Sequence, residues 1–94
     1  MKIINVLIED RIKEKILNKH NIKALEIKEV ILNKPFILKT RSNRYMAIGY
    51  YQRFVTIIFE MVKNTAFIIT AYPSSEAQKR LHKDKKWKKK IKCL

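Results

Sequence analysis

The hydrophobic residues of this 94-residue chain change their spacing once, close to residue 35. Before that point they recur every three or four residues, the period of one face of an amphipathic helix, over residues 10–19 and 23–33. After it, β-branched and aromatic residues form four runs separated by short polar breaks, which is typical of strands. The four predicted strands are Phe36 to Thr40, Tyr45 to Tyr51, Phe54 to Val62 and Ala66 to Ala71.

The breaks between these strands are too short to contain a crossover helix, so consecutive strands are expected to form antiparallel hairpins. A chain of this length has room for one compact core and no more. We therefore expect a single-domain α+β fold. In it, two N-terminal helices pack on a four-stranded antiparallel meander with strand order 1-2-3-4, and a C-terminal basic helix follows.

Residues at the predicted boundaries support this division. Asp10 is suited to cap the first helix, and Asn21, which tolerates the left-handed conformation, is suited to end it. Residues 2–8 are apolar and β-branched, so they form either a short first strand or an irregular lead-in.

A last helix is predicted to begin shortly after Pro73, which stops the fourth strand. Ser74 or Ser75, followed by Glu76, provides a cap and an acidic first turn for it. The residues of this helix expected to face inward are Ala77, Leu81 and Trp87.

The chain is strongly basic, with 22 Lys and Arg against 8 Asp and Glu, a formal net charge of +14 and a pI near 10.1. Such an excess repels itself unless it meets an anion, and it is typical of nucleic-acid-binding domains. RNA is therefore the expected partner. The alternative is that the lysine content reflects a Lys-rich proteome.

Cysteine usage and the N-terminal sequence bear on location. Cys93 has no partner cysteine, so neither a disulfide framework nor a zinc cluster is expected. The apolar stretch at the N-terminus is too short, and too soon followed by charge, for a signal peptide or a membrane span. We therefore expect a cytoplasmic protein without a membrane partner.

Five short segments occur in order between residues 9 and 82. They are Lys19 to Ile22 (KHNI), Glu26 to Val30 (EIKEV), Arg44-Tyr45 followed by Ile48-Gly49, Arg53 to Phe59 (RFVTIIF), and Ile68 to Pro73 (IITAYP) leading into Lys79-Arg80. This order resembles that of the BrnT-like and RelE-like toxins of bacterial and archaeal toxin–antitoxin operons. The resemblance implies a toxin domain over residues 1–82, with residues 83–94 as a basic extension of its last helix.

The resemblance also implies a function. It implies a metal-independent endoribonuclease that cleaves messenger RNA and needs no cofactor. The RelE-like resemblance further implies that cleavage takes place at the ribosome. A cognate antitoxin holds such toxins inactive, and in BrnT-like systems it resembles a ribbon-helix-helix DNA-binding protein.

Two residues depart from the family pattern. Asn21 stands where the turn usually has Gly, which is a mild change because Asn tolerates positive φ. Tyr72 stands where BrnT-type sequences usually place an Arg, so a phosphate-binding charge is missing. A non-catalytic RNA-binding module, or an inactive member of the same fold, is therefore the alternative.

Cleavage of RNA without a metal ion requires a base for the 2′-hydroxyl, cations around the phosphate and an acid for the 5′-oxygen. His20, in the turn between the two helices, and His82, in the last helix, are candidates for moving protons. Arg44 and Arg53 each begin a predicted strand, and each guanidinium group is a candidate for bidentate hydrogen bonds to two phosphate oxygens. Tyr72, at the end of the fourth strand, is a candidate for positioning the phosphate or moving a proton.

Each of these catalytic candidates also has a structural alternative. His20 could bond the backbone of its own turn, and His82 could be an ordinary surface residue. Arg44 and Arg53 could be solvated hairpin charges. Tyr72 could anchor the last helix against the sheet.

Three tyrosines lie in the second predicted strand. Because side chains alternate between the two faces of a sheet, Tyr45 and Tyr51 should point to one face and Tyr50 to the other. One or two of these rings could stack on an unpaired base, and core packing is the alternative.

Lysine dominates the C-terminus, with seven Lys between residues 83 and 92. This run is expected to dominate the salt dependence of RNA binding, although it could instead be a solvated tail or dock an acidic antitoxin segment. No Asp/Glu pair or His/Cys cluster has the spacing of a metal site, so no metal is expected. The residues expected to contact RNA are Lys79, Arg80, Lys83, Lys85, Lys86, Trp87, Lys88, Lys89 and Lys90.

Overall fold

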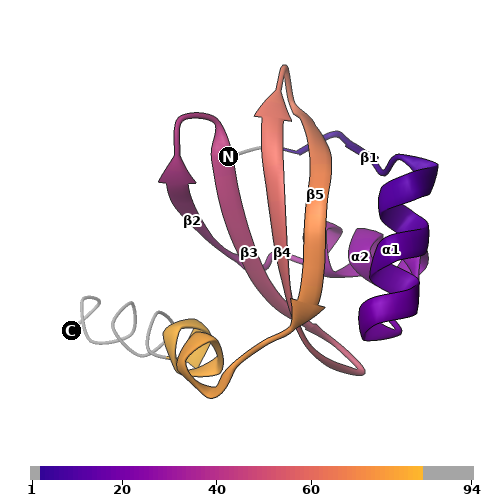
Figure 1. Ribbon diagram of the computed structural model, residues 1–94. Coiled ribbons are helices and arrows are strands. Elements are labelled where there is room, and N and C mark those ends of the chain that lie inside the picture. The colour runs from indigo at the N-terminus through magenta and orange to yellow at the C-terminus, as the bar shows by residue number, and fades with distance from the viewer. Residues whose placement is uncertain (1–2, 84–94) are drawn as a thin grey trace.

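The computed structural model of the chain describes residues 3–83, which form a five-stranded sheet with two helices against one face (Figure 1). The elements are β1 (Asn5–Leu7), α1 (Asp10–His20), α2 (Ala24–Leu32), β2 (Phe36–Arg41), β3 (Arg44–Tyr51), β4 (Arg53–Val62) and β5 (Thr65–Pro73). Residues 76–83 are also helical. The expected α+β class is confirmed.

The sheet is mixed, and its strand order is β1-β5-β4-β3-β2. Strands β2 to β5 form the expected antiparallel meander, but β1 adds a fifth strand that runs parallel to β5, with Asn5 opposite Thr65 and Leu7 opposite Phe67. The predicted four-stranded, wholly antiparallel sheet is therefore wrong. A strand of three residues gives a weak local pattern, and its partner here is the strand most distant from it in sequence.

Asn21 separates the two helices in the left-handed conformation predicted for it, with φ 54° and ψ 40°. Its N–H donates to the carbonyl oxygen of Leu17 at 2.9 Å and so ends α1. At the other end, Glu9 occupies the capping position and its side chain makes no capping bond. The predicted cap, Asp10, lies one residue further on, where its charge still favours the positive end of the helix dipole.

The core lies between α1, α2 and the face of the sheet that they cover. Gly49 allows α2 to approach β3 closely, because a Cβ at this position would lie 2.8 Å from Cγ1 of Val30 and 3.2 Å from Cβ of Pro35. The buried residues of the core are Ile16, Ile22, Ile27, Val30, Ile31, Ala47, Val55, Ile57, Phe59, Ala66, Ile68 and Ala71.

The helical residues 76–83 contact the opposite face of the sheet. The helix begins at a capping box, in which Gln78 N–H donates to Ser75 Oγ at 3.2 Å and Ser75 N–H donates to Gln78 Oε1 at 2.9 Å. Ala77 and Leu81, which were predicted to face inward, are exposed. Gln78 and His82 contact the sheet instead, so the prediction chose the wrong face of this helix.

The predicted basic extension over residues 83–94, including Trp87, lies outside the described residues apart from Lys83. The division into residues 1–82 and 83–94 therefore stays a prediction. Within residues 3–83, no helix is both long and apolar enough to cross a membrane.

Candidate active site

A chain of hydrogen bonds connects β4 and β5 to the helical residues 76–83. The hydroxyl oxygens of Ser74 and Thr56 lie 2.7 Å apart, and Thr56 Oγ1 donates to Gln78 Oε1 at 2.9 Å. Nε2 of Gln78 donates to the hydroxyl oxygen of Tyr72 at 3.1 Å and also lies 3.6 Å from Sδ of Met46. Thr56 is fully buried, so the inner end of the chain is shielded from water, and the outer end is the half-buried Tyr72.

Tyr72 lies opposite Thr56 in the β4–β5 ladder, on the face of the sheet away from α1 and α2. β1 pairs only with residues 65–67, so within the described chain the second half of β5 is an edge. The end of α1 reaches this edge. The ring centroid of His20 lies 6.3 Å from that of Tyr72, with the two planes tilted by 55°. The structure thus brings together two residues that the sequence analysis selected separately.

Arg53 joins the start of β4 to the turn between the helices. Its Nε donates to Oε2 of Glu26 at 2.8 Å, and its Nη2 donates to Oε1 of Glu26 at 3.3 Å and to the carbonyl oxygen of Asn21 at 2.6 Å. The hydrogen bond to Glu26, with the charge of that carboxylate, raises the pKa of Arg53 and outweighs the opposing effect of burial. Because Asn21 directly follows His20, these bonds also fix the segment that carries His20.

A hollow of about 500 Å³ opens beside Arg53. The arginine side chain is 38% exposed, and the three bonds above use Nε and Nη2 but not Nη1. Two N–H donors of a permanently charged group therefore remain for an anion, for which the planar guanidinium is well suited. The hollow is lined by Asn21, Lys23, Leu25, Glu26, Tyr51, Gln52 and Arg53.

Arg44 lies at the other end of the sheet. In the β3–β4 ladder Arg44 is opposite Glu60, whereas Arg53 is opposite Tyr51. Seven residues of strand separate the two positions, which is about 23 Å. Because antiparallel strands begin at opposite ends of the sheet, one phosphate cannot lie beside both strand positions, and phosphate binding by either arginine alone stays a prediction.

His82 contacts an aromatic pair on the same face as Tyr72. Its ring centroid lies 5.4 Å from that of Phe54, which in turn lies 5.2 Å from that of Tyr50, and both contacts are edge-to-face. Tyr50 is 59% exposed, whereas Tyr45 and Tyr51 pack against the core on the other face, as strand alternation predicted. Tyr50 is thus the tyrosine of β3 with a ring accessible to a base.

The fold is similar to that in the crystal structure of the ribonuclease toxin BrnT from Brucella abortus, with a TM-score of 0.63, 24% sequence identity, and coverage of 81% of this chain and 99% of BrnT. The chain has a BrnT-like fold. This confirms the resemblance to BrnT that the sequence segments indicated, while RelE-like is a looser description. No protein-family model and no curated protein sequence matches the chain.

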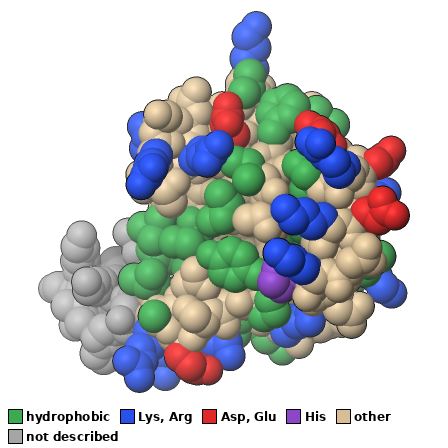
Figure 2. Space-filling view, viewed as in Figure 1, with side chains coloured by type: hydrophobic (Ala, Val, Ile, Leu, Met, Phe, Trp, Pro, Cys, Tyr) green, Lys and Arg blue, Asp and Glu red, His purple; other side chains and the backbone are tan. Residues whose placement is uncertain are grey.

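Positive charge is spread over this BrnT-like domain. Figure 2 shows hydrophobic side chains gathered over the strands, with Lys and Arg side chains at several separate places around them, so the cations of residues 3–83 do not form one continuous surface on this side. Lys79 pairs with Glu76 at 3.3 Å, and Arg80 and Lys83 are exposed. The other residues expected to contact RNA lie outside the described part of the chain: Lys85, Lys86, Trp87, Lys88, Lys89 and Lys90.

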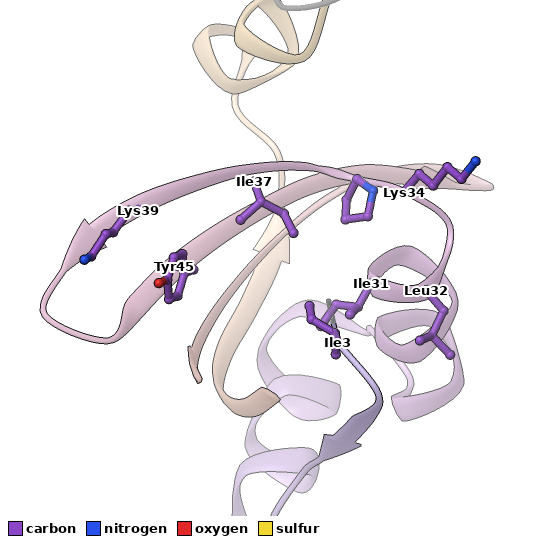
Figure 3. Close-up of a pocket in the computed structure, with 8 residues that line it drawn as sticks. Ile3, Ile31, Leu32, Lys34, Ile37, Lys39 and Tyr45 are labelled. Atoms are coloured by element: carbon purple, nitrogen blue, oxygen red, sulfur yellow. The ribbon is translucent and has the colours of Figure 1, made fainter. Parts of the chain in front are cut away.

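A second hollow, of about 660 Å³, lies between α2 and the β2–β3 hairpin (Figure 3). Isoleucine side chains point into it, while Lys34 and Lys39 point away from it. None of its lining residues is a histidine or a carboxylate, so it lacks a group suited to proton transfer at neutral pH. The lining residues are Ile3, Ile31, Leu32, Lys34, Pro35, Ile37, Lys39 and Tyr45.

Sequence reasoning missed four residues of the candidate site, namely Glu26, Thr56, Ser74 and Gln78. Gln78 could have been found, because Ser75 followed three residues later by Gln is a capping-box signature. Glu26 falls on the buried side of α2, where a charge needs a partner. Within residues 3–83, no group of three or more His, Cys, Asp or Glu side chains is placed to hold a metal ion.

Proposed function

We propose that this chain is the toxin of a type II toxin–antitoxin system and acts as a metal-independent endoribonuclease on messenger RNA. The observation that carries the proposal is the contact between His20 and Tyr72 at one end of a BrnT-like sheet. The Brucella abortus protein of the same fold is a ribonuclease toxin, which supports the same class of activity here.

The proposed reaction is attack of a ribose 2′-hydroxyl on the adjacent phosphate. The bond from phosphorus to the 5′-oxygen breaks, so a 2′,3′-cyclic phosphate and a 5′-hydroxyl are formed. His20 accepts the proton of the 2′-hydroxyl, and Tyr72 donates a proton to the departing 5′-oxygen. Arg53, through Nη1, stabilises the charge that builds on the phosphate. These side chains supply a base, an acid and a cation, so the reaction needs no metal ion.

Further contacts with RNA are proposed on the same face of the sheet. Tyr50 offers a stacking surface to an unpaired base, and His82 borders it through Phe54. Lys79, Arg80 and Lys83, from the last helix, would meet phosphates of the same strand.

A cognate antitoxin is proposed to hold the toxin inactive. Its toxin-binding segment should be acidic, because this chain carries a formal net charge of +14. The resemblance to BrnT-like systems supports an antitoxin of the ribbon-helix-helix type, a cytoplasmic location and messenger RNA as the substrate.

The purified protein is expected to cleave single-stranded RNA in EDTA and to leave 2′,3′-cyclic phosphate ends, because protein side chains provide the acid, base and cation. The ends can be identified by a resistance to ligation that persists after alkaline phosphatase, which does not act on a cyclic phosphate, and is lost after polynucleotide kinase, which opens the ring and removes the phosphate to leave a 3′-hydroxyl. Arg44→Ala, altered at the far end of the sheet, should cleave like the wild type. RNA that stays intact with EDTA and with Mg²⁺, together with normal growth of cells that produce the protein, would refute the proposal.

A non-catalytic RNA-binding protein of the same fold is the second candidate. It is favoured by the position of Arg53, whose guanidinium is already bonded to Glu26 and to the backbone. It is also favoured by Tyr72, which stands where an arginine is usual in BrnT-type sequences. Intact RNA together with salt-sensitive binding would select this candidate, and the absence of both would indicate an inactive member of the fold.

RNA binding is expected to weaken with salt, by about 0.7 in the slope of log K against log salt for each phosphate contacted on a single strand. Changing Lys79, Arg80 and Lys83 together to Gln should therefore reduce this slope by about 2. Fluorescence anisotropy with a 2′-methoxy oligonucleotide, which cannot be cleaved, measures it. Lys63→Gln, in the β4–β5 turn at the opposite end of the sheet, is the matched control. A triple variant with the wild-type slope would show that these cations do not meet RNA.

A further inference from the structure

We infer that Gln78 is a positioning residue that aims the hydroxyl proton of Tyr72 away from the last helix and toward the bound phosphate. This inference rests on the proposed ribonuclease function, because it assigns a cause to the acid role of Tyr72. The hydrogen bonds around Gln78 carry it.

The orientation of the Gln78 amide is fixed by its neighbours. Its Oε1 lies 2.9 Å from the backbone nitrogen of Ser75, and a backbone N–H can only donate. Oε1 must therefore face Ser75, where it also accepts from Oγ1 of Thr56 at 2.9 Å. The NH₂ end is then the one that faces Tyr72, at 3.1 Å from its hydroxyl oxygen.

The remaining hydrogen bond of this series, between Thr56 and Ser74, also has one possible direction. Thr56 uses its hydroxyl hydrogen for Gln78, so in the 2.7 Å contact with Ser74 it accepts and the Ser74 hydroxyl donates. No buried side-chain nitrogen or oxygen within residues 3–83 lacks a hydrogen-bond partner. Reversal of one of these hydrogen bonds would leave two donors or two acceptors facing each other. Every hydrogen bond from Ser74 through Thr56 and Gln78 to Tyr72 therefore has a fixed direction.

The fixed direction of the Gln78 amide determines where the hydroxyl hydrogen of Tyr72 points. Its oxygen accepts from Gln78, so its own hydrogen points elsewhere, because the hydrogen and the accepted bond occupy different directions around a phenolic oxygen. The Tyr72 hydroxyl makes no other hydrogen bond within the described residues, and the Tyr72 ring contacts His20. The hydroxyl proton is thereby available to the leaving oxygen of RNA, as a general acid requires.

Gln78 also caps its helix through the reciprocal bonds with Ser75. One side chain therefore sets both the start of the helix and the direction of the Tyr72 proton. Ser75 belongs only to the first of these functions, which makes the two separable by substitution.

Gln78→Glu tests the inference with little change in shape. A carboxylate still accepts from Ser75 and Thr56, and Glu is a usual residue at this position of a capping box. It cannot donate to Tyr72 and instead attracts the hydroxyl proton toward itself. We expect kcat for RNA cleavage at neutral pH to fall about tenfold or more, because the acid is turned away from the substrate, with KM nearly unchanged.

The pH profile separates this effect from a structural one. Below a pH of about 4.3, the ordinary pKa of Glu, the carboxyl group becomes protonated and can donate to Tyr72 as Gln does. The ratio of variant to wild-type kcat should therefore rise as pH falls. Gln78→Ala is the second variant: it removes the donor without reversing the bond, so its kcat should lie between those of the wild type and Gln78→Glu.

A purely structural role predicts the opposite order, since Ala removes the cap that Glu keeps. Ser75→Ala is the control: it should lower Tm by roughly 5 °C through loss of the cap, with kcat retained. A value of kcat for Gln78→Glu equal to that of the wild type, or a ratio independent of pH, would overturn the inference.

A measurement on the protein without RNA distinguishes failure of the proposed ribonuclease function from failure of the proposed role of Gln78. In protein labelled with ¹³C at Cζ of tyrosine, the Tyr72 signal can be identified by its loss in Tyr72→Phe. Gln78→Glu should shift this signal, because the phenol changes from accepting a hydrogen bond to donating one, and the shift should disappear at low pH. If the wild type does not cleave RNA, the proposed function fails while this signal still tests the hydrogen bond. An unshifted signal would refute the bond itself.

Discussion

Tyr72→Phe is expected to lower kcat for RNA cleavage by about 10² to 10⁴-fold, because a positioned general acid contributes a factor of this size. The substitution removes one hydroxyl group and keeps the ring that contacts His20. The protein should remain folded, since the loss is one hydrogen bond from Gln78, worth about 1 kcal/mol. Single-turnover cleavage of a labelled oligonucleotide measures the first effect, and thermal unfolding measures the second.

The leaving group can show which proton Tyr72 moves. An RNA with sulfur in place of the 5′-bridging oxygen releases a thiolate, which departs without being protonated. Tyr72→Phe should cleave this substrate at a rate close to that of the wild type, whereas His20→Ala should stay slow, because the 2′-hydroxyl still needs a base. Tyr45→Phe, on the opposite face of the sheet, is the matched control. Equal defects of Tyr72→Phe on both substrates would contradict the acid role.

The spacing of hydrophobic residues predicted both N-terminal helices and strands β2 to β5 to within two residues at each end. These elements are long enough for their period to be read locally. β1 was left undecided between a strand and an irregular lead-in. Its pairing with β5 depends on the tertiary fold, which brings the last strand of the sheet beside the first residues of the chain. Local period cannot report which strands become neighbours, and this is why the sheet was predicted with four strands instead of five.

The candidate site was predicted in part. His20 and Tyr72 were selected because their side chains can carry protons and because they lie at the ends of predicted elements, but their contact depends on where α1 ends relative to β5. Gln78 was missed because the inward face of the last helix was assigned by hydrophobicity, to Ala77 and Leu81. The contact of this helix with the sheet is polar at Thr56, so hydrophobic spacing pointed to the wrong face.

Arg53→Ala is expected to destabilise the fold by about 1–3 kcal/mol, because Glu26 is only 9% exposed and loses both of its hydrogen bonds. The carbonyl oxygen of Asn21 loses its 2.6 Å partner as well, so the turn that carries His20 is released. Cleavage should fall about tenfold or more, from loss of the phosphate contact and from displacement of the base. Urea unfolding and single-turnover kinetics measure the two effects.

The two contributions of Arg53 can be separated by a second substitution. Glu26→Gln alone should be mild, because an amide can still accept from Arg53 through its oxygen. In the Arg53→Ala background, Glu26→Gln replaces an unpaired charge with a neutral group and should recover part of the lost stability. If cleavage stays low while stability returns, Arg53 acts on the phosphate through Nη1. If both return together, Arg53 serves only to hold the turn, and another cation must meet the phosphate, for which Lys23, which lines the same hollow, is the candidate.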